Sequence, residues 1–333
     1  MKIKQAFSDF KKSSVFSSVI VFILLLVINI VLQPRFFTGP VLKSNIMTFT
    51  PLILLAMAQA VIVLSGSIDL SIGTSVTLIN VVIASIMQDS AASIALALIA
   101  GFAVAMMTAA VNGLCIGIVK MPPMVATFAT STVWYGIALL IMPQPGGYVP
   151  ADFYRLYQKS LFDIIPVSLI LVAAAVLIWL FIKKRRIFRN IYAAGGNENA
   201  ALANGIKTSR TKISAFLIAG IFITLAAFAV TAQTASGDAH VGDSFALTSI
   251  AAIVIGGVSL AGGRGTILGA VLGAVSLNIL MNIIFFANIP SLYQEFLKGL
   301  IIIVSLVLSI IPNLRNARKQ TIVKKLNVMG AKQ

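Results

Sequence analysis

Side chains that enzymes commonly use for catalysis are scarce in this sequence. It has one histidine (His240), one cysteine (Cys115) and nine acidic residues among 333. No His/Cys cluster has the spacing of a metal site, no Gly-x-x-x-x-Gly-Lys-Ser/Thr segment is present to hold a nucleotide phosphate, and no serine is paired with a plausible general base. The sequence therefore predicts no enzymatic activity, no cofactor and no metal. We interpret His240 as a solvated loop residue and Cys115 as a small buried one.

Charged residues of either sign are also rare. They make up 10% of the chain, whereas 59% of the residues are hydrophobic, and a soluble globular domain carries about 25% charged residues to cover its surface. Water cannot be the main solvent for such a chain. Because long apolar stretches recur along the whole length, we interpret the chain as one membrane domain with no sizeable soluble domain attached.

The 25 Lys and Arg residues are clustered. Four lie in the first 12 residues, eight between Lys183 and Lys212, and six from Arg315 onward. The positive-inside rule places all three segments in the cytoplasm. The net charge of +16 therefore results from basic segments that orient the protein in the membrane and contact its lipid. For this reason we predict no binding to nucleic acid.

Ten apolar stretches are long enough to cross a hydrocarbon core of about 30 Å. They lie at about residues 14–32, 46–64, 72–87, 93–119, 124–142, 161–182, 213–234, 245–260, 266–286 and 296–312. Six precede the basic loop and four follow it, so both termini and that loop fall on one side. The sequence therefore predicts an all-α polytopic membrane protein with about ten transmembrane helices, some broken or re-entrant. Its parts are a cytoplasmic segment 1–13, a transmembrane domain 14–312 with a cytoplasmic loop 183–212, and a basic tail 313–333; segments 143–160 and 235–244 are external loops.

Two glycine-rich segments, 65–73 and 256–265, interrupt the apolar sequence. When they are aligned from Gly66 and Gly256, they share two glycines and a leucine, which is consistent with an internal two-fold repeat. Broken helices at corresponding positions of two halves can line a solute pathway, whereas glycines also simply permit close helix packing. The candidates for gating or structural turns are Gly66, Gly73, Gly256, Gly257, Gly263 and Arg264; the last of these is equally explained as a basic membrane anchor.

Polar side chains within the spans are the candidates for the translocation pathway. Asp69 is the one acidic residue in a glycine-rich break, where it can contact a solute, act in gating, or cap the helix that follows. The amides suit hydroxyl-rich solutes because they donate and accept hydrogen bonds, but they also join helices; they are Gln59, Asn80, Asn112, Asn278 and Asn282. Trp134 and Tyr135 suit either stacking on a sugar ring or an interfacial aromatic belt.

One cytoplasmic segment is typical of a short docking helix. Residues 198–203 favour a helix, Asn197 can cap its start and Gly205 its end. The pattern Glu198-x-Ala200-Ala201-x-x-x-Gly205 resembles the coupling-helix signature of ABC importer permeases, in which this element fits the ATPase subunit. The resemblance implies contacts to an ATPase by Gly195, Gly196, Glu198, Ala200, Ala201 and Gly205.

Four motifs extend the resemblance over residues 46–312. They are Ser-Gly-Ser-Ile-Asp-Leu-Ser-Ile-Gly at 65–73, Met-Pro-Pro-Met-Val-Ala-Thr at 121–127, Ala-Gly-Gly-Asn-Glu-Asn-Ala-Ala at 194–201, and Ile-Ala-Ala-Ile-Val-Ile-Gly-Gly-Val-Ser-Leu-Ala-Gly-Gly-Arg-Gly-Thr at 250–266. Together they resemble the ribose-type ABC sugar permeases, which serve ribose, galactose, xylose and autoinducer-2. The resemblance implies a bacterial inner-membrane importer with two permease subunits, ATPase subunits that hydrolyse ATP, and an extracytoplasmic sugar-binding protein.

The chain departs from that family at three positions. Ser67 replaces a usual glycine, and Ala246 and Thr248 stand where acidic residues are common, which fits one half of a permease heterodimer, although a homodimer stays open. A stand-alone transporter driven by an ion gradient is the alternative function. It needs intramembrane carboxylates, for which the sequence offers Asp69, with Glu295 near the external interface. The sequence does not identify the solute.

Overall fold

The computed structural model describes residues 14–161 and 165–290, together with residues 293, 294, 296, 297, 299, 300 and 303. Most of this part of the chain is helical. The helices are α2 (Ser14–Leu32), α3 (Gly39–Leu64), α4 (Ile72–Ile86), α5 (Ala91–Gly117), α6 (Pro123–Ile141), α7 (Ala151–Gln158), α8 (Val167–Lys183), α9 (Arg186–Gly196), α10 (Glu198–Ala203), α11 (Thr208–Thr234), α12 (Phe245–Ile255) and α13 (Ile267–Phe286). The segments predicted at 1–13 and 313–333, and most of the span predicted at 296–312, lie outside the described residues.

The all-α membrane fold is confirmed, and the number of crossings stays a prediction. Five helices in the described part are long and apolar enough to cross a membrane, namely α3, α5, α6, α11 and α13, and α8 with α9 makes a sixth if that pair, bent by 82°, is one span. The apolar helices α4 and α12 are shorter. Helices α4 and α12 are short because each adjoins one of the two glycine-rich breaks.

Local sequence sets where several helices begin. Pro40 in the first turn of α3, where no amide donor is needed, follows an extended Thr38, so this helix starts earlier than the apolar pattern alone predicts. The Ser90 hydroxyl caps α5 by accepting from the Ser93 amide at 3.2 Å, and the Thr266 hydroxyl caps α13 by accepting from the Gly269 amide at 2.9 Å. Strands β1 (Ser160–Leu161) and β2 (Ile165–Pro166) pair antiparallel and delay α8 to Val167.

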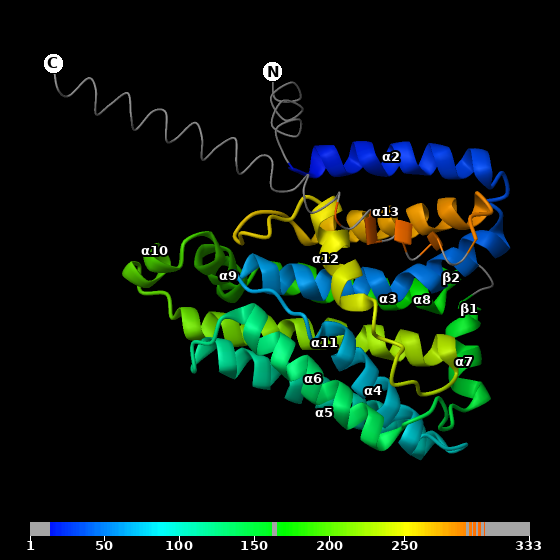
Figure 1. Cartoon of the computed structure of the whole chain (residues 1–333), viewed down its shortest axis with the longest axis horizontal. Coiled ribbons are helices and arrows are strands. Elements are labelled where there is room, and N and C mark those ends of the chain that lie inside the picture. Colours follow the sequence, from blue (N-terminus) through cyan, green and yellow to red (C-terminus); the bar gives the residue numbers. More distant parts are fainter. Residues whose placement is uncertain are drawn as a thin grey trace.

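Helix α3 forms the centre of the packed core. Every residue from Phe49 to Leu64 is buried, and α3 packs against α8, α11, α12 and α13 (Figure 1). Helices α5 and α6 instead expose large apolar side chains such as Ile99, Phe102 and Phe128, as a surface facing lipid or another subunit requires.

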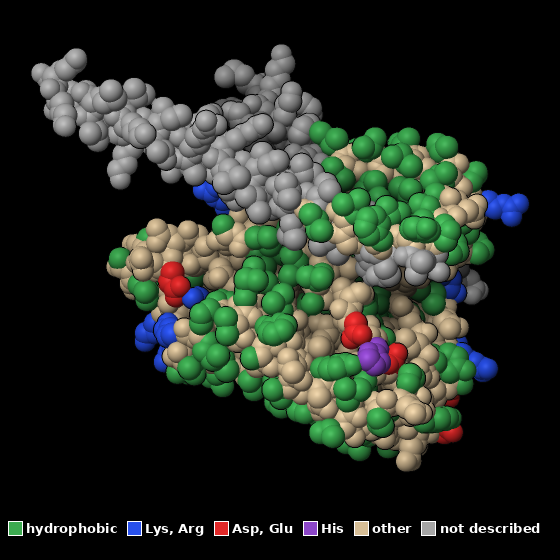
Figure 2. All heavy atoms as spheres, in the orientation of Figure 1, with side chains coloured by type: hydrophobic (Ala, Val, Ile, Leu, Met, Phe, Trp, Pro, Cys, Tyr) green, Lys and Arg blue, Asp and Glu red, His purple; other side chains and the backbone are tan. Residues whose placement is uncertain are grey.

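The two ends of the molecule carry different parts of the sequence. Helices α9 and α10 lie at one end, and α7 lies at the opposite end (Figure 1). At the α7 end, Gly146 and Gly237 exchange two backbone hydrogen bonds of 2.9 and 2.7 Å, so the two segments predicted as external loops meet. Lys and Arg side chains gather at the ends, with mostly hydrophobic and uncharged surface between them (Figure 2).

Candidate functional site

Both glycine-rich breaks end a helix with the same turn. After α3, Gly66 has φ +82°, its N–H donates to the Val63 carbonyl, and the next N–H donates to the carbonyl of Ile62. After α12, Gly257 has φ +77° and the same two bonds recur, to Val254 and Ile253. This left-handed C-cap strongly favours glycine. The structural match is therefore Gly66 with Gly257, and the alignment of Gly66 with Gly256 is wrong by one residue.

Asp69 lies in the first break and is 2% exposed. Its Oδ1 atom accepts hydrogen bonds from the amide and the hydroxyl of Ser71, both at 2.7 Å, immediately before α4 begins. The carboxylate therefore closes a turn at the start of α4 and satisfies an amide ahead of the helix. Asp69 therefore stabilises the turn ahead of α4, but the predicted N-cap role is wrong, because Ser71 is the N-cap residue and the helix has no side-chain cap hydrogen bond; a contact with solute stays a prediction.

A chain of hydrogen bonds connects Asp69 to two further helices. The Ser71 hydroxyl accepts from the Asn112 amide of α5 at 2.7 Å, and the Thr130 hydroxyl of α6 donates to the Asn112 carbonyl oxygen at 2.6 Å. The side-chain amide of Gln59, oriented to match its surroundings, faces the backbone N–H and C=O of Asp69 at 3.3 Å each. The structure therefore brings three of the predicted pathway residues together.

The hydroxyl residues of this network were not predicted. Thr127 of α6 accepts from the Leu70 amide at 3.1 Å and lies 3.2 Å from the Ile68 carbonyl oxygen, so it also braces the break. A serine or threonine inside an apolar helix usually bonds to its own backbone. Sequence alone therefore gives no signal that separates Ser71, Thr127 and Thr130 from ordinary helix residues.

The other predicted pathway amides make their bonds elsewhere. Asn80 donates to the Thr231 hydroxyl at 3.0 Å and accepts from the Asp238 amide at 2.9 Å, so it fastens segment 235–244 to α4. Asn282 donates to the side chain of Asn45 at 3.2 Å, and Asn278 donates to a carbonyl of its own helix. Asn80 and Asn282 therefore join parts of the fold, whereas Asn278 bonds within α13, and the structure brings none of the three to Asp69.

The docking helix has the predicted bounds and caps. Helix α10 spans Glu198–Ala203, and the Asn197 side chain accepts from the Ala200 amide at 3.0 Å. Gly205 has φ +78°, and the following amide donates to the Ala201 carbonyl at 3.0 Å, which closes the C-terminus.

Glu198 forms an ion pair within the chain. Its carboxylate lies 2.7 Å from Nζ of Lys212 on α11, and the two side chains are 39% and 12% exposed, respectively. Partial burial opposes ionisation, but the hydrogen bond and charge of Lys212, assisted by Thr208 and Lys120, hold the pKa of Glu198 below its ordinary value. The residue predicted to contact a partner thus also fixes α10 against α11.

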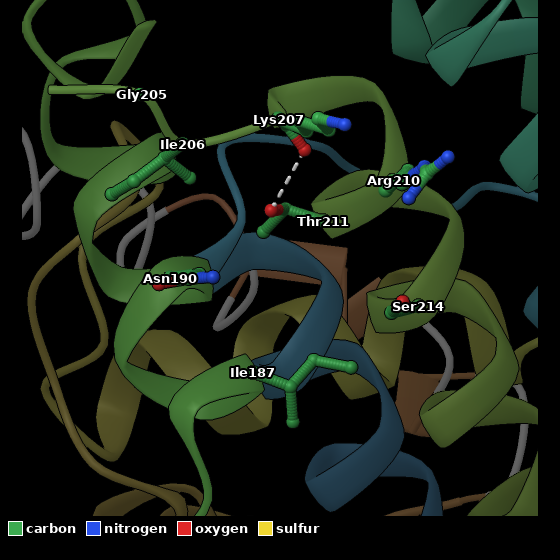
Figure 3. Close-up of a pocket in the computed structure, with 8 residues that line it drawn as sticks. All are labelled: Ile187, Asn190, Gly205, Ile206, Lys207, Arg210, Thr211 and Ser214. Carbon is green, nitrogen blue, oxygen red and sulfur yellow. Dashed lines mark hydrogen bonds between the residues drawn. The ribbon is translucent and has the colours of Figure 1, made fainter.

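A pocket of about 570 Å³ lies beside α10 (Figure 3). Its walls come from α9, from the segment after α10 and from the first turns of α11; the lining residues are Ile187, Asn190, Gly205, Ile206, Lys207, Arg210, Thr211 and Ser214. In Figure 3 the cationic ends of Lys207 and Arg210 extend away from Asn190, while Ile187 projects toward the α11 wall. The pocket thus has an apolar and amide-bearing wall with positive charge at its rim.

The end of α9 meets both breaks. The Gly263 amide donates to the Leu64 carbonyl at 3.2 Å, which joins the second break to the end of α3. Gly195 packs against this contact, and the Tyr192 hydroxyl donates to the Gly265 carbonyl at 2.8 Å. Four glycines that were predicted for separate roles therefore meet in one contact. We call this contact the glycine junction; it consists of Gly66, Gly195, Gly196 and Gly263.

The remaining candidate turn residues lie around these segments. Gly73, in the first turn of α4, packs against the backbone of Gly242, and Gly256 packs against Gly269 of α13. Arg264 is exposed in the second break. No group of three His, Cys, Asp or Glu side chains in the described part of the chain has the arrangement of a metal site.

Comparison with known proteins gives one family. The family model described as "Branched-chain amino acid transport system / permease component" matches residues 41–306. The ribose import permease protein RbsC of Bacillus subtilis is 34% identical over 258 residues, which cover 77% of this chain and 80% of that protein. The galactose/methyl galactoside import permease protein MglC of Haemophilus influenzae is 28% identical over 322 residues, or 90% and 95% of the two chains.

A further relative is named for a different substrate. The autoinducer 2 import system permease protein LsrC of Yersinia enterocolitica is 31% identical over 274 residues, which cover 79% of this chain and 75% of that protein. No solved structure matches the chain.

Proposed function

The chain belongs to the ribose-type permeases of the branched-chain amino acid transport system / permease component family, and from this premise we propose that it is the membrane subunit of an ATP-binding-cassette importer for a sugar or sugar-like solute. It is a multi-pass protein of the bacterial inner membrane. The observation that carries the proposal is the capped docking helix α10, whose neighbour α9 ends at the glycine junction between the two helix breaks.

We propose a topology of ten crossings with both termini in the cytoplasm. In this topology the breaks at 65–71 and 256–266 and the loop with α9 and α10 are cytoplasmic, and segments 143–160 and 235–244 are external. The glycine junction on one side and the Gly146–Gly237 bridge on the other support this assignment, because segments assigned to the same side lie in contact.

The proposed ATPase subunit docks on α10 and the adjacent pocket. Helix α10, with its capped ends and exposed Ala200, is a small convex element. The pocket beside Gly205 adds an adjacent cavity with a basic rim. Movement of α10 is transmitted to the two breaks through α9, because α9 ends at Gly195 and Gly196 within the glycine junction. ATP hydrolysis belongs to the partner, and this chain supplies no catalytic residue.

In the proposed importer, the buried network of Gln59, Asp69 and Asn112 holds the first break in place beside the translocation pathway. A second permease subunit, identical or different, completes the pathway, and a loaded extracytoplasmic sugar-binding protein docks on the bridged external loops. An ion-coupled transporter is less well supported, since the Asp69 carboxylate is engaged by the amide and the hydroxyl of Ser71 in the same chain.

Reconstitution tests this proposal. The chain is co-purified with a partner ATPase subunit, placed in proteoliposomes with a sugar-binding protein, and assayed for ATP-dependent uptake of radiolabelled sugars and for ATPase activity stimulated by the loaded binding protein. We expect both activities, and Glu198→Lys is expected to uncouple them, because it places a cation beside Lys212. Uptake that follows an ion gradient without ATP would contradict the proposal.

A further inference from the structure

Three polar side chains gather on the face that carries the chain's one histidine. The ring nitrogen Nδ1 of His240 lies 3.1 Å from Oδ2 of Asp243 and 3.3 Å from the hydroxyl of Tyr135 on α6, and the two rings meet edge to face at 5.7 Å. The His240 amide donates to Oδ1 of Asp238 at 2.8 Å, which fixes the backbone of the loop. The cluster is thus held from two elements.

The cluster lies well below the external ends of the helices. Segment 235–244 does not stay above the helices, because the Gly242 amide donates to the Thr77 hydroxyl at 3.0 Å. The external end of α4 is marked by Ala84, whose carbonyl accepts a hydrogen bond from the amide of Tyr148 in the external loop. Thr77 lies seven residues before Ala84, which is about 10 Å along α4. Tyr135 lies six residues before the end of α6 at Ile141, which gives about 9 Å by the same rise per residue.

Exposed charge at this depth has a specific requirement. The side chains of His240 and Asp243 are 57% and 58% exposed, and the surface around the histidine and the acidic side chains beside it is hydrophobic or uncharged (Figure 2). Lipid cannot solvate a carboxylate, so ionisable groups inside a membrane face a water-filled space or a partner. Segment 235–244 therefore acts as more than a solvated loop.

We propose that Tyr135, His240 and Asp243 form a contact site for a neutral, hydroxyl-rich solute on the wall of the translocation pathway. An Nδ1–H that donates to Asp243 leaves Nε2 as an acceptor, and the carboxylate accepts further hydrogen bonds, while the tyrosine hydroxyl donates. Sugar hydroxyls match this set, and the tyrosine ring offers an apolar contact. The carboxylates of Asp238 and Asp243 disfavour an anionic solute.

This inference rests on the proposed importer function, and a labelling experiment separates the two. In the reconstituted complex with Cys115→Ser, a single cysteine is introduced as His240→Cys or as Ile99→Cys. Ile99 lies on α5 at a similar depth and is 66% exposed among apolar side chains. A charged, membrane-impermeant methanethiosulfonate reagent is added on either side. We expect the His240→Cys variant to react, with loss of uptake, and the Ile99→Cys variant not to react.

The alternative outcomes are distinct. If the thiol of the His240→Cys variant is unreactive in an assembled complex, lipid or the second subunit covers the cluster, and the inference is overturned. Absence of ATP-dependent uptake by the Cys115→Ser parent complex, with the thiol of the His240→Cys variant still reactive, would overturn the importer function and leave the aqueous site standing.

Near-isosteric variants test the solute contact itself. Tyr135→Phe and Asp243→Asn each remove one polar function, so we expect the maximal uptake rate to fall about 2- to 10-fold, as for loss of one hydrogen bond, with the complex still assembled. Asp89→Asn is the control, because Asp89 is an exposed carboxylate bonded to the Tyr148 hydroxyl between α4 and α5. Equal uptake by all three variants and the parent would overturn the proposal.

Discussion

The Cα atom of Gly195 lies so close to the carbonyl oxygen of Leu64 that a β-carbon at Gly195 would overlap this oxygen. The same β-carbon would lie 2.8 Å from the Gly66 nitrogen and 2.9 Å from the Gly263 nitrogen. Because the Gly263 amide donates to Leu64, a side chain at Gly195 would enter the hydrogen bond that joins the two helix breaks.

Replacement of Gly195 by alanine is therefore expected to uncouple the importer. A methyl group here forces the end of α9 away from both breaks. Because this contact couples the ATPase docking site to the breaks, we expect a loss of about tenfold or more in uptake and in the ATPase activity stimulated by the binding protein. The ATPase subunit should still co-purify, because α10 keeps its caps. A β-carbon at Gly196 meets no atom within 4 Å, so the Gly196→Ala variant should lose much less of both activities. Equal losses of activity in the two variants would refute the role of the junction.

Helix α10 gives a prediction about docking. Gly205 adopts φ +78°, which strains any residue with a β-carbon, and Asn197 supplies the N-terminal cap. We expect Gly205→Ala and Asn197→Ala each to weaken α10 by about 1 kcal/mol, which lowers the affinity for the ATPase subunit several-fold. Titration of the subunit against the purified permease measures this change. Asn197→Asp, which keeps a capping oxygen, should retain most of the affinity, and a loss as large as that of the alanine variant would contradict the capping role.

Helix α10 was predictable because its caps and composition act within a few residues. The glycine junction was not, because it joins segments near residues 65, 195 and 263, whose sequences carry no sign that they meet. The alignment of the two breaks failed for a related reason. Both Gly256 and Gly257 match Gly66 as letters, and only the backbone shows that the second one takes the left-handed conformation.

The site was also only partly predictable. Amides inside apolar spans were visible in the sequence, yet Asn112 bonds within the Asp69 network while Asn80 anchors a loop. Nothing local separates these two roles, since both depend on which helix lies opposite. Segment 235–244 was predicted as an external loop from the order of the apolar spans, but contacts with α4 draw it below the helix ends.

The ion pair between Glu198 and Lys212 predicts a pH dependence. The pKa of Glu198 is lowered in the folded protein, so the pair contributes stability above the ordinary glutamate pKa and loses it as pH falls through the lowered value. Because Glu198 is 39% exposed, we expect at most about 1 kcal/mol. Thermal unfolding of the purified permease at neutral and acidic pH should show a smaller acid-induced loss for Glu198→Gln than for the parent. An identical loss in both proteins would contradict this assignment.

The two roles left open for Asp69 can be separated with Asp69→Asn and Asp69→Ala. Asparagine keeps an Oδ1 acceptor for the Ser71 amide and hydroxyl, so the turn before α4 should persist, whereas alanine leaves these buried donors without a partner at a cost of about 1 to 3 kcal/mol. If Asp69 only stabilises this turn, the asparagine variant transports at nearly the parental rate and only the alanine variant loses thermal stability. If the charge contacts the solute or gates the pathway, the asparagine variant stays folded but loses uptake. We expect the first result, because the carboxylate is 2% exposed and is held by Ser71; uptake assays on stability-matched preparations decide between the two.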